Sequence, residues 1–397
     1  MVPFLSISCP GATPHWLLAV APLAQRWSPS ERRMIGNATL VNVGANKGYM
    51  LALHMAIFSQ RFEDPRGYAR GWHDSILEYA RAHHKLGLLH VPYLACGVCG
   101  ACKDLLPKSA SEHVRSSGVA HALEILPANV ELMRGVVERR NLSDRILVHH
   151  LAGSNESRPL HMLLDEFTPP AQASQAGRES NTVCDEGVVA PGAAAPSRTG
   201  RCDPLNGANA ARIAVVQGVS LDDFFDRQRL DAAFVVSIDA EGHDPLIVEG
   251  MERLLMARRV AIVHFEKHMK GYWNPSHPER RTLRSVVHYL SALGYKCFVE
   301  GMRFLTPISP PSCWLDSFES ISWSNVVCAH DADVLQRLRA LQIRSVEDVV
   351  TDFVRFAQGP VAAWRKLSKW PWHDERQAEV ARCWFRHKFG NVSSVRL

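Results

Sequence analysis

Two carboxylates and an imidazole follow one apolar run of the sequence, at Asp239, Glu241 and His243. The run, residues 234–238, is continuously hydrophobic, which predicts a strand covered on both faces. Ligands of open α/β sheets bind beyond the carboxyl ends of such strands. Because a half-buried carboxylate is costly without a partner, we expect the two acids to bind a ligand or to take part in catalysis. The alternative is that either acid only caps the next helix.

A second group of residues with chemical potential lies at the ends of two earlier apolar runs. The run 39–43 is followed by a turn with Gly44 and Gly48, and glycines there let the backbone approach a ligand and expose the amides of a helix N-terminus. This spacing is common, so its position after a strand is what gives it weight. Glu124 ends the run 119–124, where a carboxylate can accept hydrogen bonds from both hydroxyls of a ribose. Its alternative role is a helix cap.

Short β-rich runs alternate with helical patterns along the chain, and this alternation predicts a parallel sheet covered by helices. The fold class is therefore α/β, with a Rossmann-like, mostly parallel sheet of seven strands and helices on both faces. Strands are expected at 39–43, 119–124, 146–151, 234–238, 260–265, 295–299 and 325–329, and helices at 49–58, 127–140, 243–257 and 280–293.

Two segments interrupt the alternation. Residues 61–118 are polar and rich in Cys and His, and residues 166–209 are rich in Ala, Pro, Gly and Ser. The second segment cannot bury enough apolar surface to offset its ordering entropy, so we expect a disordered loop. The alternation resumes after it, which argues against a domain boundary. We expect an N-terminal extension over 1–35, one Rossmann-like domain over 36–330 and a helical C-terminal extension over 331–397.

Three segments of the predicted sheet resemble, in order, the motifs of the FkbM-type methyltransferases. They are residues 41–48, 123–129 and 238–243, and the family motifs read Asp-x-Gly-Ala-Asn-x-Gly, Glu-Pro-x-Pro-x-Asn and Ile-Asp-x-Glu-Gly. The third motif is the most specific of the three. The resemblance covers about residues 38–330, with both insertions excluded.

The resemblance implies a class I methyltransferase fold and methyl transfer from S-adenosylmethionine, typically to an oxygen of a sugar, a polyketide or a similar small molecule. The implied partner is thus a hydroxylated small molecule. Carried over by position, the resemblance places Gly44, Ala45, Asn46 and Gly48 at the methionine end of the donor, Glu124 at the ribose, Ala152 near the adenine and Asp239 at the sulfonium.

The sequence departs from the family pattern at Asn42, where the family has an acid. We still count Asn42 among the donor-binding residues, because an amide can orient backbone groups, although it cannot offset the ammonium of the methionine moiety. Ile125 and Lys47 are further departures. One alternative is therefore a catalytically inactive protein that keeps the cofactor fold. A nicotinamide-dependent oxidoreductase is another, but the chain lacks the required Gly-x-Gly-x-x-Gly.

Methyl transfer is an in-line displacement, so most of its rate comes from holding the acceptor oxygen in line with the methyl carbon. A base that removes the acceptor's proton would add to this rate. We expect His243 or Glu241 to act as the base while Asp239 positions donor and acceptor. A divalent ion held by Asp239, Glu241 and Glu266 is an alternative, because hard oxygen ligands suit Mg²⁺.

The cysteines Cys96, Cys99 and Cys102 have Cys-x2-Cys-x2-Cys spacing and could give three thiolates to a structural zinc ion. A fourth ligand could come from His83, His84, His90 or a distant cysteine. The alternative is free thiols in a variable insertion. A ferredoxin cluster would need a fourth cysteine at position 106, which is leucine.

Composition narrows the class of protein further. The 397 residues carry a formal charge of +5 with no basic run, which argues against a nucleic-acid partner, although RNA stays an alternative. No stretch approaches the roughly 20 apolar residues of a membrane span. The apolar run 16–24 lacks preceding basic residues and predicts a helix packed on the domain. Ten scattered cysteines in so long a chain indicate reduced thiols and a cytoplasmic location.

Overall fold

The computed structural model describes residues 15–24, 27–28, 33–34, 38–59, 67–83, 105–106, 118–163, 182–184, 213–301, 305–310, 314, 318–319 and 323–342. None of the helices in these ranges is long and apolar enough to cross a membrane.

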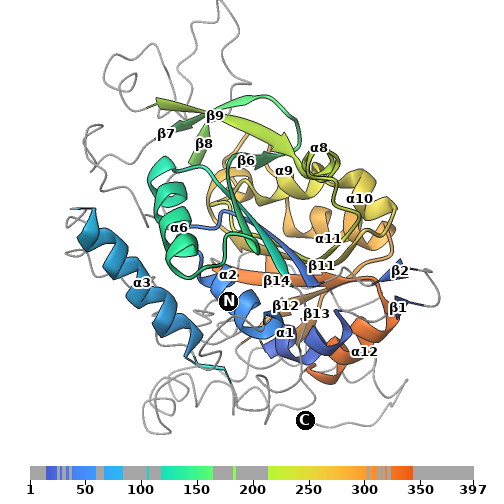
Figure 1. The fold of residues 1–397 in the computed structure, drawn as a ribbon. Coiled ribbons are helices and arrows are strands. Elements are labelled where there is room, and N and C mark those ends of the chain that lie inside the picture. Colours follow the sequence, from blue (N-terminus) through green and yellow to red (C-terminus); the bar gives the residue numbers. More distant parts are fainter. Residues whose placement is uncertain are drawn as a thin grey trace, which may run out of the picture.

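The described chain is built on a sheet of eight strands in the order β13-β12-β14-β11-β10-β3-β4-β5 (Figure 1). Neighbours from β11 to β5 pair in parallel, whereas β14 runs antiparallel to both β11 and β12. The expected Rossmann-like class is confirmed, with one strand more than the seven predicted: β13 is a short addition at the edge beyond β12. The strands are β3 (Thr39–Val43), β4 (Val119–Glu124), β5 (Ile146–His150), β10 (Ala233–Ile238), β11 (Val260–His268), β12 (Lys296–Glu300), β13 (Leu305–Pro307) and β14 (Trp323–Ala329).

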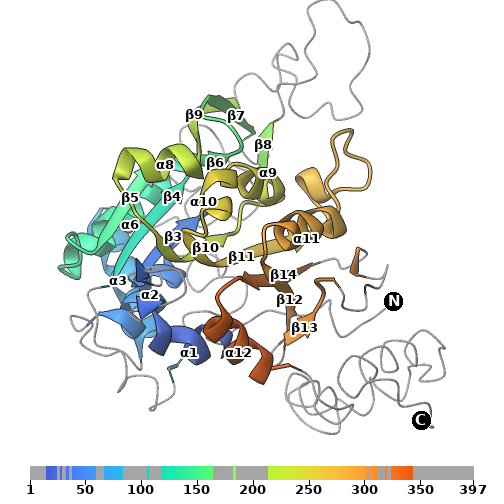
Figure 2. The ribbon, with the colours of Figure 1, turned by 90° about the vertical axis from the view of Figure 1, so that its right-hand side faces the viewer.

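The central strands are buried on both faces because they are apolar throughout. Every residue of β3 and β10 is buried, including the polar Asn42 and Ser237. One face packs against α1 (His15–Val20), α2 (Tyr49–Phe58), α3 (Tyr68–Ala82), α6 (Pro127–Arg139) and α12 (Ala332–Ala340). The other face packs against α8 (Leu221–Gln228), α9 (Asp244–Glu249), α10 (Glu252–Met256) and α11 (Leu283–Ala292), and Figure 2 shows the two layers on either side of the sheet.

Among the parallel strands, the order reverses direction between β3 and β10. The chain moves outward from β3 through β4 to β5, and then returns to place β10 on the other side of β3. In open α/β sheets this switch point is where ligands bind, outside the carboxyl ends of the strands. The two motifs at residues 44–48 and 239–243 follow these two strands, so the topology brings them to the same place.

Between β5 and β10 the chain forms a second sheet that the sequence pattern did not predict. Its order is β6-β9-β7-β8, with β6 (Ala152–Ser154) parallel to β9 (Ile213–Ser220) and β7 (Pro159–Leu163) antiparallel to β9. Strand β8 (Thr182–Cys184) pairs with β7 and lies inside the segment 166–209, so the expectation of a disordered loop is wrong for these three residues. A further two-stranded sheet consists of β1 (Trp27–Ser28) and β2 (Arg33–Met34).

Helix α2 matches its expected bounds and α6 ends one residue early, whereas α11 begins three residues after the expected start at 280. The largest difference follows β10. A single helix was expected over 243–257, but the structure has α9 and α10, interrupted at Gly250 and Met251. Gly250 lies against β6, since a Cβ at this position would be 2.0 Å from the carbonyl oxygen of Ser154. The break therefore follows from the close approach of the second sheet, which the local sequence does not reveal.

Both extensions contribute a described helix to the domain. In the N-terminal one, α1 buries Trp16, Leu17 and Val20, as expected for a helix packed on the sheet, and the 3-10 turn η2 (Ala21–Leu23) follows it. In the C-terminal extension, α12 begins at Asp331, whose side chain accepts hydrogen bonds from the amides of Asp333 and Val334. The predicted helical character of residues 343–397 lies outside the described residues.

The interpretation of all cysteines as reduced thiols is wrong for one pair. Cys297 on β12 and Cys328 on β14 are joined by a disulfide. They are direct partners in the antiparallel register, with a Cα–Cα distance of 4.0 Å, and both are buried in the sheet. The pairing is set by the sheet register between segments 31 residues apart, which spacing alone does not disclose.

Burial of His54 in α2 predicts a loss of stability in mild acid. The side chain is fully buried, its Nε2 lies 2.7 Å from the carbonyl oxygen of Ala38, and burial lowers its pKa to about 4. Because the folded pKa lies below the unfolded one, the contribution of the neutral ring is present above about pH 6.5 and is lost as pH falls towards 4. This linkage amounts to about 3 kcal/mol at most.

We therefore expect His54→Gln, which keeps a donor towards Ala38, to flatten the decline in unfolding free energy between pH 7 and pH 4.5. Urea denaturation at several pH values measures this slope. Equal slopes in the variant and the parent would show that His54 does not cause the pH dependence, whatever the difference in their absolute stabilities at pH 7.

Candidate functional site

The glycine turn after β3 lies directly against the loop after β10. Gly44 has a φ of +75°, and a Cβ there would be 1.8 Å from the carbonyl oxygen of Asp239. The Asp239 amide donates to the carbonyl of Val43 at 2.9 Å, and the Gly44 amide donates to that of Leu123 at 2.9 Å. Only glycine fits this contact, and the ends of three neighbouring strands are thereby held together.

Glu124, at the end of β4, ties the glycine turn to the start of α6. Its Oε2 accepts the backbone amide of Asn46 at 2.7 Å, and its Oε1 accepts that of Leu126 at 2.9 Å. Burial raises the pKa of this carboxyl above its ordinary value, while the amides of Leu126 and Asn46 favour the ionised form. The side chain of Asn129 and the backbone amide of Ile125 also hydrogen-bond to this carboxyl, so four donors hold it at the junction of β4 and α6.

The loop after β10 is shaped by a residue to which sequence reasoning gave no role, Asp244. This carboxyl is fully buried and accepts the amides of Ala240 at 3.2 Å and Gly242 at 3.0 Å. Burial, followed by the charge of Asp239, raises the pKa of Asp244 to about 8. In the sequence, Asp244 is an acid in the first turn of a helix, and an acid at that position is normally interpreted only as a helix cap.

Of the three predicted catalytic residues, Asp239 and Glu241 lie at the sheet edge and His243 turns inward. Asp239 is exposed, and Glu241 has a φ of +52° and is paired with the Lys270 ammonium. His243 is buried, and its Nε2 lies 3.1 Å from the Ser154 hydroxyl on β6. The geometry thus gives His243 a contact with the second sheet.

The end of β11 adds acids and a histidine to this edge. His268 Nε2 lies 3.4 Å from Glu266 Oε2 and 4.0 Å from Glu241 Oε2, while its Nδ1 accepts the Lys270 amide at 3.2 Å. Because Nδ1 accepts, the neutral ring carries its proton on Nε2, towards the carboxylates. Burial, with Lys270 and Lys267 as further causes, lowers the pKa of His268 to about 3. His268 was missed because the predicted strand ended at 265.

Ala152, expected near the adenine, lies at the start of β6 and is buried in a small cluster with Leu160 and Val216. The partly buried Ile125 packs on this cluster, and the Leu151 amide donates to the Glu124 carbonyl at 3.2 Å. The structure therefore brings Ala152 beside the Glu124 turn. Ile125 was considered only as a departure from the family motif.

Neither metal hypothesis gains support from the described geometry. Within the described ranges, no group of three or more His, Cys, Asp or Glu side chains is arranged to hold a metal ion, and this covers Asp239, Glu241 and Glu266. Cys96, Cys99 and Cys102 lie outside the described residues, so the structural zinc stays a prediction.

The strand order, the glycine turn and the acid after the second strand define a Rossmann-like methyltransferase of class I. The family model described as "Methyltransferase FkbM domain" matches residues 99–297, about half of the chain. The chain therefore belongs to the FkbM methyltransferase family, as the sequence motifs indicated, and the oxidoreductase alternative is set aside.

Other comparisons add little. No curated protein matches the chain. Among solved structures, an O-methyltransferase from Bacillus cereus in complex with SAH has 10% sequence identity and a TM-score of 0.30, covering 79% of this chain and 87% of that one. A protein of the NADB-Rossmann superfamily from Streptococcus agalactiae has 9% identity and a TM-score of 0.27, covering 98% and 97%. Both TM-scores lie below 0.5, so the assignment stands on the family model.

The family implies S-adenosylmethionine as methyl donor, and the residues at this edge fit it. Two buried amide oxygens, Asn42 Oδ1 and Asn46 Oδ1, have no hydrogen-bond partner within the described structure, and the donor's ammonium can supply one. The carboxylate of Glu124 lies at the strand end where an acid accepts ribose hydroxyls in Rossmann-like folds. This edge thus carries acceptors of the kind that the donor's ammonium and hydroxyl groups require.

The contact between Gly44 and Asp239 predicts that Gly44→Ala disrupts the donor site. The added methyl would collide with the Asp239 carbonyl, so we expect affinity for S-adenosylhomocysteine to fall at least about tenfold. Gly294→Ala is the matched control: it has a φ of +90°, but its added Cβ would meet only Arg258 Nη2, at 3.5 Å. Calorimetry should show unchanged affinity for the control, despite a stability loss of about 1 kcal/mol. Equal affinities in both variants would contradict the model of the site.

Proposed function

We propose that this methyltransferase transfers a methyl group to a hydroxyl oxygen of a small molecule or sugar. The supporting observation is the meeting of Gly44, Glu124 and Asp239 at one sheet edge, with carboxylates continuing along that edge. Glu241 and Glu266 continue the row of carboxylates from the Asp239 loop to the end of β11. A hydroxyl of the acceptor can donate a hydrogen bond to these carboxylates.

In this proposal Gly44, Ala45, Asn46 and Gly48 surround the methionine end of the donor, with Asn42 beneath them. Asn42 Nδ2 donates to the Ser237 carbonyl at 3.4 Å, which leaves its oxygen to face the ammonium. Glu124 accepts the ribose hydroxyls, and Ile125, beside Ala152, packs against the adenine. When bound, S-adenosylmethionine supplies a methyl group activated by its sulfonium.

Asp239 is the best placed of the acids to take the acceptor's proton. Its backbone touches the glycine turn and its side chain is exposed at the edge where the acceptor must approach. Glu241 is engaged by the Lys270 ammonium, and its Oε2 lies 4.0 Å from His268 Nε2. We therefore assign proton acceptance to Asp239 and acceptor positioning to Glu241 and Glu266, and His243 supports the loop through Ser154.

Substitutions separate these roles. We expect Asp239→Asn to lower kcat about 10²-fold or more, because a general base contributes about 10²–10⁴-fold. Glu241→Gln should mainly raise KM for the acceptor, and His243→Asn should lower the melting temperature with a smaller effect on kcat. Turnover is measured by mass spectrometry with a hydroxylated acceptor found by screening. Unchanged kcat in Asp239→Asn, or the largest loss in His243→Asn, would contradict the assignment.

An inactive cofactor-binding protein is the second candidate function, because Asn42 replaces the family's acid. Calorimetry with S-adenosylmethionine and S-adenosylhomocysteine distinguishes the two. Binding of both without turnover on any hydroxylated compound would favour the inactive protein, and binding of neither would overturn the donor site itself. Asn42→Asp tests the replaced acid directly, since tighter donor binding would show that the ammonium lacks a counter-charge in the parent.

A further inference from the structure

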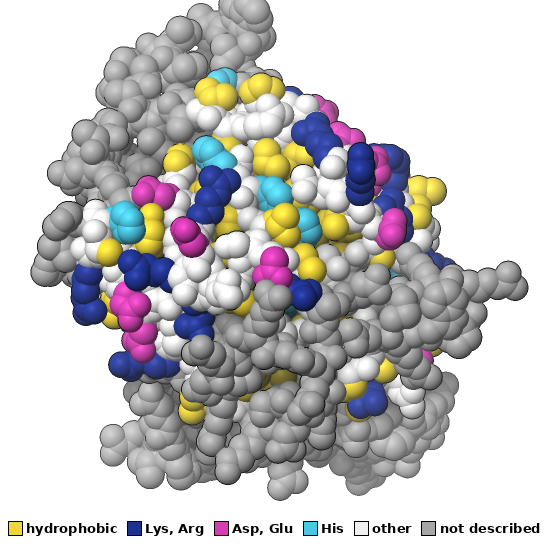
Figure 3. All heavy atoms as spheres, in the orientation of Figure 1, with side chains coloured by type: hydrophobic (Ala, Val, Ile, Leu, Met, Phe, Trp, Pro, Cys, Tyr) yellow, Lys and Arg dark blue, Asp and Glu magenta, His cyan; other side chains and the backbone are white. Residues whose placement is uncertain are grey.

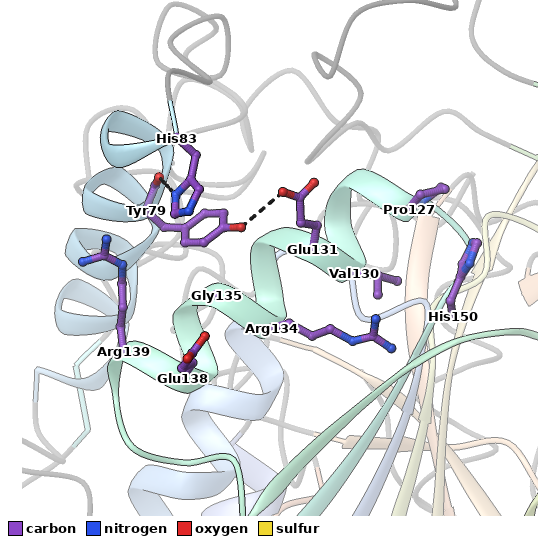
Figure 4. Close-up of a pocket in the computed structure, with 10 residues that line it drawn as sticks. All are labelled: Tyr79, His83, Pro127, Val130, Glu131, Arg134, Gly135, Glu138, Arg139 and His150. Carbon is purple, nitrogen blue, oxygen red and sulfur yellow. Dashed lines mark hydrogen bonds between the residues drawn. The ribbon is translucent and has the colours of Figure 1, made fainter.

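A cavity of about 600 Å³ lies between α3 and α6 and extends to the end of β5 (Figure 4). The C-terminal part of α3 contributes Tyr79 and His83, and α6 contributes most of the other side chains. None of its lining residues belongs to the donor site or to the residues assigned to methyl transfer. The cavity is also partly made by residues 61–118, the insertion that interrupts the sheet pattern.

One corner of this cavity is fixed by a glycine inside a helix. Gly135 lies in the middle of α6, where glycine costs about 1 kcal/mol relative to alanine. A Cβ at Gly135 would be 2.0 Å from the Tyr79 ring, so the glycine allows Tyr79 to lie across α6. The Tyr79 hydroxyl donates to Glu131 Oε1 at 3.2 Å, and the exposed His83 ring stacks on Tyr79 at 4.1 Å between centroids.

Charges around the cavity are balanced and interleaved. Along α6, Glu131, Arg134, Glu138 and Arg139 supply two carboxylates and two guanidinium groups, so their formal charges cancel. Figure 3 shows acidic and basic side chains interspersed over this part of the surface, where Figure 1 places α6. The lining therefore has no excess charge of either sign with which to favour an anionic or a cationic ligand.

Hydroxyl groups match this lining because each one both donates and accepts. Arg134 uses one donor on the Val148 carbonyl at 2.9 Å, and a guanidinium has five in all. Burial and the charge of Glu131 raise the pKa of Tyr79, so its hydroxyl stays protonated at neutral pH. The volume lies within the usual range for small ligands, about 300–1,000 Å³, and the lining combines these charged groups with the apolar surface of Pro127 and Val130.

From this lining we propose that the α3–α6 cavity binds a neutral, hydroxyl-rich ligand of the saccharide class. Carboxylates and guanidinium groups bind the hydroxyls, and the exposed His83 ring gives the C–H face of a sugar a flat surface. The proposal rests on the cavity alone and does not depend on the proposed methyl acceptor.

Calorimetry of the full chain tests the proposal with three neutral trisaccharides, maltotriose, cellotriose and mannotriose, beside glucuronic acid and glucosamine as charged probes. We expect at least one trisaccharide to bind and each charged probe to bind more weakly. Glu131→Ala should lower trisaccharide affinity about tenfold, since it removes a charged hydrogen-bond acceptor. Arg70→Ala, on the exposed start of α3 and outside the cavity, should leave affinity unchanged.

Tyr79→Phe is the second variant, because it keeps the ring and removes only the hydroxyl. It should weaken trisaccharide binding severalfold, while affinity for S-adenosylhomocysteine stays at the parent value in every variant. Absence of binding by all three trisaccharides, tighter binding of a charged probe, or unchanged affinity in both Glu131→Ala and Tyr79→Phe would overturn the proposal. A failure here would leave the methyltransferase site untouched, since the two sites share no residue.

Discussion

The contact between the Gly44 backbone and the Asp239 carbonyl is the constraint on which the rest of the site depends. It lies at the switch point of the sheet, where β3 and β10 run side by side and the turns that follow them touch. No side chain fits between the two turns, so the loop after β10 must lie directly on the glycine turn. Every proposed role, from Asn46 to Asp239, assumes this closeness. Asp244 keeps the second turn in place by accepting two of its amides.

A row of buried polar residues crosses the sheet beneath this contact and accounts for Asn42. Ser237 lies 3.0 Å from His264 Nδ1, and His264 Nε2 lies 3.3 Å from Glu300 Oε2. Asn42 joins the row by donating to the Ser237 carbonyl. An ionised aspartate at position 42 would place a second acceptor against that carbonyl, at an energetic cost. The replacement of the family's acid is therefore consistent with the local hydrogen bonding of β3 and β10.

Sequence reasoning found most elements of the main sheet because each is short, apolar and bounded by turns. Residues 39–43, 49–58 and 119–124 match their observed elements end to end. It missed features that depend on contacts between distant segments: the second sheet, the break at Gly250 and the disulfide between Cys297 and Cys328. A three-residue strand such as β6 carries no periodic signal, since its pairing with β9 comes from a segment about 60 residues away.

The difference between local sequence signals and contacts between distant segments also explains which site residues could be predicted. Gly44, Glu124 and Asp239 each end a recognisable strand, so position alone marks them, and the sheet topology brings them together. His268 lies at the end of a strand longer than its apolar core, and its importance comes from the carboxylates that its Nε2 faces. Asp244 was visible but could not be distinguished from a helix cap until its two amide partners were known.

The insertion between α2 and β4 also supports the donor site, because one of its helices contacts the glycine turn. Trp72 on α3 donates its indole N–H to the Lys47 carbonyl at 2.7 Å, within the glycine turn, and its ring lies where a Cβ on Gly48 would be. Arg140, after α6, donates to the Gly71 carbonyl at 2.9 Å and so holds α3 in place. A segment outside the predicted alternation of strands and helices therefore supports the turn that the family motif defines. Helix α3 thus contacts the donor turn through Trp72 and the α3–α6 cavity through Tyr79.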